Sequence, residues 1–194
     1  MKMLLIVALI TILASCTRNH NPCVIISTGL GDIEAEIYLD KAPVTAGNFL
    51  KYVDAGKYNN LAYFYRVVRQ DNQPNKKVKI EVIQGGFYHD SLIEKYQFKP
   101  IRHETTKETG ILHKDGVLSM ARNEPGTASS EFFICIVDQP ELDFGGTRNP
   151  DKQGFAAFGK VTKGMDVVLK IQKLKDKEQY LEKPVKIIGI SRIK

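Results

Sequence analysis

The stretch LAYFYRVV, residues 61–68, decides the fold because it predicts a strand that must bury at least one face. Aromatic residues and two terminal valines give it the composition typical of strands. Arg66 is the exception, since it places a guanidinium in the middle of an apolar run. Regular alternation would put Arg66 on one face with Phe64 and Val68. We therefore expect Arg66 to project from a sheet onto a groove; the alternative is an arginine that reaches into solvent from a strand edge.

The sequence on both sides of this stretch predicts many short strands and two helices. Residues 23–39 alternate apolar and polar side chains around a turn at 28–31, which is the period of a strand. The first helix has Pro43 in its first turn and Gly56 at its stop. This pattern predicts a mainly β fold, either a closed barrel or a sandwich. We expect two strands within 23–39, further strands at 61–68, 77–87, 116–122, 131–137, 155–161 and 184–193, helices at 41–56 and 165–174, and irregular polar chain at 88–115 and 142–154.

The beginning of the chain predicts an export signal. Lys2 precedes the apolar run MLLIVALITILA, residues 3–14, which is shorter than the roughly twenty residues that a helix needs to cross a bilayer. The run has the length of the apolar region of a secretory signal, and it leads into Leu-Ala-Ser-Cys at 13–16, which resembles a bacterial lipobox. A plain signal peptide and a short buried segment are the alternatives. We divide the chain into a lipoprotein signal peptide at 1–15, a lipidated Cys16 with a short tether at 16–23, and a folded domain at 24–194.

Composition excludes several classes of function. Of the 194 residues, 43% are hydrophobic and 26% charged, and the net charge is +6, as in an ordinary globular protein. The densest lysine runs, at 76–79 and 173–177, lack the interleaved aromatic residues of a nucleic-acid groove, so we expect no nucleic-acid partner. The four histidines are scattered, and we expect no metal site. Cys23 and Cys135 could pair in an oxidising compartment, but two cysteines do not establish a disulfide.

Five motifs together carry a family resemblance. FYRVV, IQGGF, LSMAR, SSEFFI and FAAFGKVTKGMDVV occur in this order. Each is weak alone, but the series resembles the cyclophilin family of peptidyl-prolyl isomerases over roughly residues 24–193. The resemblance implies an eight-stranded antiparallel closed β-barrel capped by two helices. It also implies catalysed rotation about X-Pro bonds without any cofactor, because no bond is broken.

Bond rotation defines what a catalyst must supply. The amide resists twisting by ~18–20 kcal/mol, and its twisted transition state has a proline nitrogen with a free lone pair. A hydrogen-bond donor to that nitrogen, a grip on the proline ring and exclusion of water would all lower the barrier. Arg66 can donate because its planar fork stays charged. The resemblance implies that Arg66 is the catalytic arginine and that Gln84 orients it and contacts the substrate backbone.

The resemblance also implies a set of substrate-binding residues. Phe133 would form the floor of the proline pocket, with Val82, Leu142 and Phe155 as its walls. Ala121 and Arg122 lie on the segment that would pair with the substrate backbone. Ordinary core packing is the alternative for Val82, Phe133, Leu142 and Phe155.

Departures from the family pattern affect the outer subsites. The interval between Arg66 and Gln84 is longer than usual, so residues 69–79 are an insertion. Glu81 replaces an aromatic residue and Glu141 a tryptophan, so cyclosporin-type inhibitors should bind poorly. Glu131 replaces a glutamine; two positions from Phe133, it should face the groove, where it could pair with Arg66 and fix its rotamer.

Two functions of different classes follow. The first is an active prolyl isomerase of the bacterial cell envelope that assists folding of exported, proline-containing polypeptides and is held to a membrane by the lipid on Cys16. The second is a binding or chaperone module that keeps the groove but turns over weakly. Arg66, Gln84 and Phe133 together favour the enzyme. We expect a monomer, and the sequence does not distinguish the inner membrane from the outer one.

Overall fold

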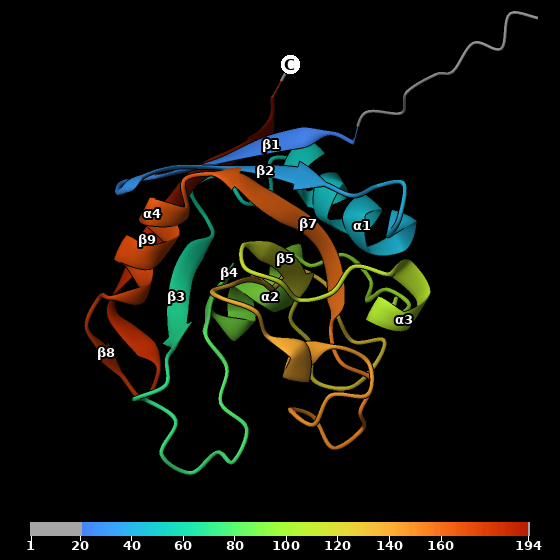
Figure 1. Cartoon of the computed structure of the whole chain (residues 1–194). Helices are drawn as coiled ribbons and strands as arrows, with labels where there is room; N and C mark the ends of the chain where they lie inside the picture. The colour runs from blue at the N-terminus through green and yellow to red at the C-terminus, as the bar shows by residue number, and fades with distance from the viewer. Residues whose placement is uncertain (1–20, 194) are drawn as a thin grey trace, which may run out of the picture.

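Strands from the whole length of the chain close into one barrel (Figure 1). The computed structural model describes residues 21–193, and in this part nine strands form a single antiparallel sheet in the order β1-β2-β7-β5-β6-β4-β3-β9-β8, with β1 also pairing with β9. Eight strands therefore make the closed ring, as expected, while the short β8 pairs only with β9. The strands are β1 (Cys23–Thr28), β2 (Gly31–Ile37), β3 (Tyr63–Val68), β4 (Val82–Gly86), β5 (Val117–Met120), β6 (Phe132–Cys135), β7 (Ala156–Lys163), β8 (Asp176–Lys177) and β9 (Tyr180–Arg192).

Two amphipathic helices cover the barrel, as predicted (Figure 1). Helix α1 (Pro43–Asp54) has its proline in the first turn, and Gly56 just beyond it adopts a φ of 61° that favours glycine. The α1 side chain Phe49 is fully buried against Phe132 and Phe158, with ring centroids 5.4 Å and 5.0 Å away. Helix α4 (Met165–Gln172) buries Val167, Val168 and Ile171. Both helices thus complete the apolar core inside the barrel.

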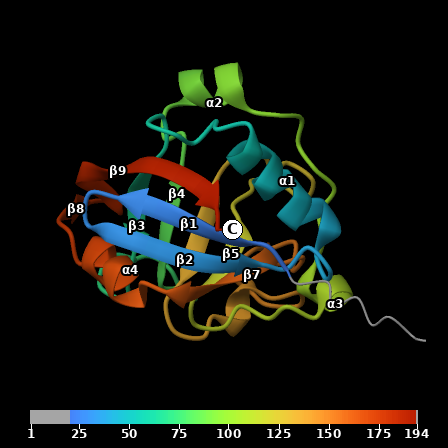
Figure 2. The same cartoon turned by 90° about the horizontal axis from the view of Figure 1, so that it is seen from above.

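The region 88–115, predicted as irregular chain, contains two short helices. In α3 (Thr106–Thr109), the side chain of Thr105 accepts from the backbone of Glu108, and Glu108 accepts from the backbone of Thr105. This capping box, Thr-x-x-Glu, is visible in the sequence and was missed. Helix α2 (Asp90–Tyr96) buries none of its residues completely and lies outside the barrel wall (Figure 2). Its apolar side chains Leu92, Ile93 and Tyr96 are only partly buried against the core, and seven residues are too few for hydrophobic periodicity to reveal a helix.

Two strand boundaries also differ from the prediction. Strand β4 begins at Val82, five residues later than expected, because the inserted chain before it turns back in a loop of its own. Strand β9 begins at Tyr180, before Pro184, and forms a hairpin with β8 that was not predicted. Pro184 falls where β9 is out of register with β3, so its missing N–H interrupts no regular ladder.

The alternation expected for residues 61–68 is wrong at one point. The pairing of β3 with β4 and with β9 shifts register between Phe64 and Arg66, which makes Tyr65 the extra residue of a β-bulge. Phe64 and Val67 lie in the barrel core, whereas Tyr65 and Arg66 both line a cavity on the outside. Arg66 therefore shares its face with Tyr65 and not with Phe64.

The described residues contain no membrane-crossing helix. Within 21–193, none is both long enough and apolar enough to cross a bilayer. The expected signal peptide and Cys16 lie outside the described residues. Cys23 and Cys135, the two cysteines inside them, are free thiols.

Candidate active site

Arg66 is anchored at two of its edges. Its Nη1 donates to Oε1 of Gln84 at 2.9 Å. Its Nε and Nη2 both donate to Oε1 of Gln179, at 3.1 Å and 2.6 Å. Three of the five N–H groups of the guanidinium are thus occupied, and two have no acceptor among residues 21–193. The site therefore holds a charged guanidinium in a fixed orientation, and two of its N–H groups can still donate to a ligand.

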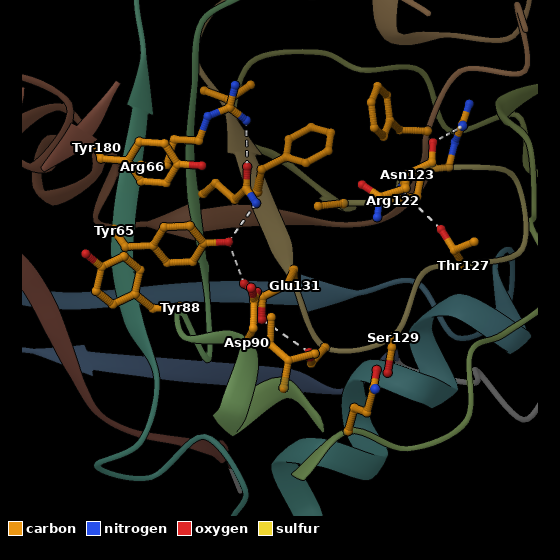
Figure 3. A pocket seen from close by; sticks show the side chains of 18 of the residues that line it. Tyr65, Arg66, Tyr88, Asp90, Arg122, Asn123, Thr127, Ser129, Glu131 and Tyr180 are labelled. Atoms are coloured by element: carbon orange, nitrogen blue, oxygen red, sulfur yellow. Dashed lines mark hydrogen bonds between the residues drawn. The ribbon is translucent and has the colours of Figure 1, made fainter. Parts of the chain in front are cut away.

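A relay of side chains continues from Arg66 along the cavity wall (Figure 3). Nε2 of Gln84 donates to the hydroxyl of Tyr65 at 2.7 Å, and that hydroxyl donates to Oε2 of Glu131 at 2.6 Å. The expected ion pair between Glu131 and Arg66 is wrong, because the bulge places Tyr65 between Glu131 and Gln84. Glu131 instead accepts from the backbone N–H of Phe87 at 2.7 Å. The carboxylate thus orients Gln84 through Tyr65, and Gln84 in turn orients Arg66.

Burial sets the electrostatics of this relay. It raises the pKa of Glu131 above its ordinary value, and the hydrogen bonds from Tyr65 and Phe87 offset this only in part. Burial also raises the pKa of Tyr65, and the neighbouring Glu131 raises it further, so the phenol stays protonated and donates. The pKa of Arg66 is lowered by burial, but a guanidinium keeps its charge in proteins. Tyr65 and Arg66 are therefore both held in the role of hydrogen-bond donors.

Next to the guanidinium lies an apolar pocket. Val82, Phe133 and Leu142 form a buried cluster, against which Ala121 and Phe155 pack. The rings of Phe133 and Phe155 meet edge to face with centroids 5.3 Å apart. The pocket is part of a cavity of about 520 Å³, into which the polar relay also faces. All nine candidate side chains predicted from the sequence line this cavity: Arg66, Val82, Gln84, Ala121, Arg122, Glu131, Phe133, Leu142 and Phe155.

Arg122 lines the cavity but its guanidinium is fully engaged. It forms two bonds with the carboxylate of Asp151, at 2.8 Å and 2.9 Å, and donates to the carbonyl of Gly154. The guanidinium also lies over the ring of Phe155, 5.2 Å from its centroid. The Arg122 side chain thus fixes the end of the 142–154 loop, which leaves its backbone as the group that could pair with a peptide.

A buried histidine supports the pocket floor from behind. His113 stacks on Phe133 with centroids 6.0 Å apart. Its Nδ1 lies 2.7 Å from Asp143, and its Nε2 lies 2.9 Å from the hydroxyl of Ser119. Ser119 is completely buried, so this serine–histidine–aspartate arrangement offers no accessible nucleophile. The arrangement therefore supports Phe133 from behind.

Several cavity residues were not identified from the sequence. Tyr88, Asp90 and Ile93 follow strand β4, and Tyr180 begins β9. Gln179 contacts Arg66 from 113 positions further along the chain, and a glutamine in a Lys-Glu-Gln-Tyr segment carries no local signal. No sequence pattern marks these residues as members of the site. In the described part of the chain, no three His, Cys, Asp or Glu side chains converge as a metal site would require.

Comparisons with known proteins agree with this geometry. The family model for cyclophilin type peptidyl-prolyl cis-trans isomerase/CLD matches residues 23–193. A peptidyl-prolyl cis-trans isomerase of Acinetobacter baylyi is 37% identical, with 92% of this chain and 89% of the relative covered. Peptidyl-prolyl cis-trans isomerase A of Dickeya dadantii is 34% identical, with 93% and 86% covered.

Solved structures give the same fold. A crystal structure of a cyclophilin type peptidyl-prolyl cis-trans isomerase from Cryptosporidium parvum superposes with a TM-score of 0.70, at 22% identity, and the match covers 89% of this chain and 98% of that one. Taken with the family match over nearly the whole described chain, this shows that the protein belongs to the cyclophilin-type peptidyl-prolyl cis-trans isomerases and is an enzyme of that class.

Proposed function

We propose that the cavity catalyses rotation about X-Pro bonds of exported polypeptides, with Arg66 as its catalytic residue. The observation that carries this is that two N–H groups of Arg66, which have no acceptor among residues 21–193, lie beside the apolar wall of a cavity of about 520 Å³. A solved relative from Cryptosporidium parvum is described in the presence of the dipeptide Ala-Pro, which supports a proline-containing ligand.

The steps follow from these positions. The proline ring lies on Phe133 between Val82, Leu142 and Phe155, where burial removes it from water. The free N–H groups of Arg66 donate to the proline nitrogen as the C–N bond twists and its lone pair becomes available. Gln84 and Gln179 hold the guanidinium, so little reorganisation is needed at the transition state. No proton is transferred and no covalent bond is broken.

Replacement of Arg66 tests this mechanism. Arg66→Ala should lower kcat/KM by ~10²–10³, the usual cost of losing one preorganised donor. Arg66→Lys should also be poor, because an ammonium cannot satisfy Gln84 and Gln179 while donating to substrate. The measurement is a chymotrypsin-coupled assay on a proline peptide with the soluble domain, residues 24–194. Arg192→Ala is the control, since Arg192 forms an exposed ion pair with Asp54 away from the cavity. Full activity of Arg66→Ala would disprove the proposed catalytic role of Arg66.

We further propose that the enzyme acts at the bacterial cell envelope, anchored by lipid on Cys16. The support is the short apolar run that ends in Leu-Ala-Ser-Cys at 13–16. One acyl chain binds membranes only marginally, so two or more are expected. Cys16→Ser in the full-length chain should abolish incorporation of labelled fatty acid and release the protein from membranes, whereas Cys23→Ser should change neither. Unchanged labelling of the Cys16 variant would refute the anchor without affecting the catalytic proposal.

A further inference from the structure

We infer that Gln179 is a positioning residue for catalysis, which rests on the proposed role of Arg66. Gln179 occupies the turn between β8 and β9, and its Oε1 accepts from both Nε and Nη2 of Arg66. These two nitrogens form one edge of the planar guanidinium. Because a single oxygen binds that edge, the plane cannot roll about the Arg66 side chain, and the unoccupied N–H groups keep a constant direction.

The two glutamines have different effects on the guanidinium. Gln84 holds Nη1 through one bond and belongs to the relay that ends at Glu131. Gln179 approaches from another element, and its amide nitrogen donates to the carbonyl of Asn72 at 3.2 Å. That bond fixes which way the amide faces, so that its oxygen points at Arg66. Together, the amides of Gln84 and Gln179 allow the Arg66 guanidinium only one orientation.

The turn that carries Gln179 is itself anchored to the inserted loop at 69–79. The carboxylate of Asp176 accepts from the backbone N–H of Gln179 at 2.9 Å and from the side chain of Asn72 at 3.1 Å. Asp176 also pairs with the guanidinium of Arg69. The backbone of the turn is bonded to β3 as well, since Val67 N–H donates to the carbonyl of Gln179 at 2.8 Å. The position of Gln179 therefore depends on strand β3, on the inserted loop and on Asp176 of β8.

The conformation of the turn indicates why the residue identity matters. Glu178 and Gln179 have φ angles of 53° and 76°, a region that glycine adopts more readily than either residue. A glutamine here is thus disfavoured by local conformation, yet its side chain is the one that reaches Arg66. Glycine at 179 would relieve the backbone and remove only the side-chain contacts, which separates a positioning role from a structural one.

The test compares variants within this turn in the chymotrypsin-coupled assay. Gln179→Gly should lower kcat by ~10-fold with little change in KM, because the proline pocket is intact and the lost bonds correspond to one anchoring contact. Glu178→Gly, which relieves the neighbouring residue without touching Arg66, should keep wild-type activity. Gln179→Glu keeps an acceptor for Arg66 but loses the donor to the Asn72 carbonyl, so its activity should lie between those of wild type and Gln179→Gly. Should Gln179→Gly fail to fold, Gln179→Met keeps the size of the side chain without the acceptor, and should lose activity equally.

A second measurement shows whether the effect passes through Arg66. In an Arg66→Lys background, Gln179→Gly should cause no further loss, because lysine lacks the edge that Gln179 binds. The Nε–H resonance of Arg66, assigned by its absence in Arg66→Ala, should shift and exchange faster in Gln179→Met than in wild type. Wild-type kcat in both Gln179→Gly and Gln179→Met would overturn the inference while leaving the Arg66 proposal intact. Full activity of Arg66→Ala would instead overturn the proposed function.

Discussion

Burial disfavours a charged carboxylate at position 131. Three neighbouring hydrogen bonds offset this cost, because Glu131 accepts from Tyr65, from the backbone of Phe87 and from Ser130. Gly86 makes room for it: a Cβ on Gly86 would lie 2.2 Å from a Glu131 oxygen, and the φ of 148° at Gly86 also favours glycine. A buried carboxylate with these donors can position Tyr65 without contacting a substrate.

The pKa of Glu131 gives the first prediction. Because burial raises its pKa above 4.5, the folded protein binds this proton more tightly than the unfolded chain does. The associated stability is fully present below pH 4.5 and is lost as the pH rises through the folded-state pKa. Relative to Glu131→Gln, which does not titrate, the unfolding free energy of wild type should therefore fall as the pH rises from about 4.5 through the folded-state pKa of Glu131.

Denaturant titrations of both proteins across this range check the sign. A constant difference, or one that grows with pH, would contradict it. In the isomerase assay, Glu131→Gln should retain kcat/KM within ~10-fold between about pH 6 and 8, since one contact is exchanged for another. A loss as large as that of Arg66→Ala would show that the carboxylate itself is needed.

Individual site residues were predictable because the family resemblance assigns them, most of them within its short motifs. Arg66, Gln84 and Phe133 lie in such motifs, and the structure brings them to one cavity. The partner of Glu131 was wrong because the prediction assumed regular alternation, and the bulge at Tyr65 changes which residue stands next to Gln84. Gln179 could not be found, because its contact depends on a turn whose position is fixed by tertiary hydrogen bonds.

At the scale of elements, two loops outside the barrel are joined beside the pocket. Arg148, from the loop at 142–154, donates to Gln73 at 3.0 Å and to the carbonyl of Val78 at 2.6 Å in the inserted loop. Gln73 is buried and donates to the carbonyls of Arg69 and Ile80. The Gln73 amide thus holds the inserted loop together, and Arg148 connects this loop to the loop at 142–154 beside the pocket.

The removal of Arg148 should loosen this loop. We expect Arg148→Ala to raise backbone hydrogen exchange of residues 70–80 by ~10-fold, because two hydrogen bonds to that loop are lost. Trypsin should also cut faster in the exposed lysine run at 76–79, while the thermal midpoint changes little. Arg102→Ala, which removes an exposed arginine paired with Glu108, is the matched control. Equal exchange in the two variants would show that Arg148 does not hold the loop.

A helix or strand was predictable from the sequence where one of its faces is buried, because burial then gives its apolar residues a regular spacing. Helix α1 and helix α4 have apolar faces and were found, and Pro43 and Gly56 marked the two ends of α1. Helix α2 has seven residues, and its apolar side chains are only partly buried, so its pattern is too short to predict a helix. The hairpin of β8 and β9 was missed because its turn has no glycine, although both turn residues adopt positive φ.

At the scale of the molecule, the barrel depends on pairing between the first and last strands. Val24 lies opposite Arg192 and Ile26 opposite Ile190, and this seam closes the ring of eight strands, while the short β8 keeps an unpaired edge. The strand patterns alone left a sandwich open, because they do not show which strands are neighbours. Only the family resemblance implied the closed barrel, and the observed strand order confirms it.

Two isoleucines of β9 offer a test of the closed core. Ile190 is 2% exposed and faces the barrel interior, whereas Ile188 on the same strand is 50% exposed. Ile190→Ala should lower the unfolding free energy by about 2–5 kcal/mol through lost burial and the cavity left behind. Ile188→Ala should stay within about 0.5 kcal/mol of wild type. Denaturant titration of the two variants measures both values, and equal losses would argue against a packed interior at this seam.

Because the first and last strands meet at this seam, the order of the strands along the chain could be changed without changing the fold. Ile193 N–H donates to the carbonyl of Cys23 at 2.8 Å, so the two ends of the barrel domain are neighbours. They lie at the top of the view in which the loops at 69–79 and 142–154 hang below (Figure 1). A short linker could therefore join the ends, and the chain could be reopened in an exposed loop such as 76–79. Such a circular permutant would keep every strand neighbour and the same groove while its residues followed one another in a new order.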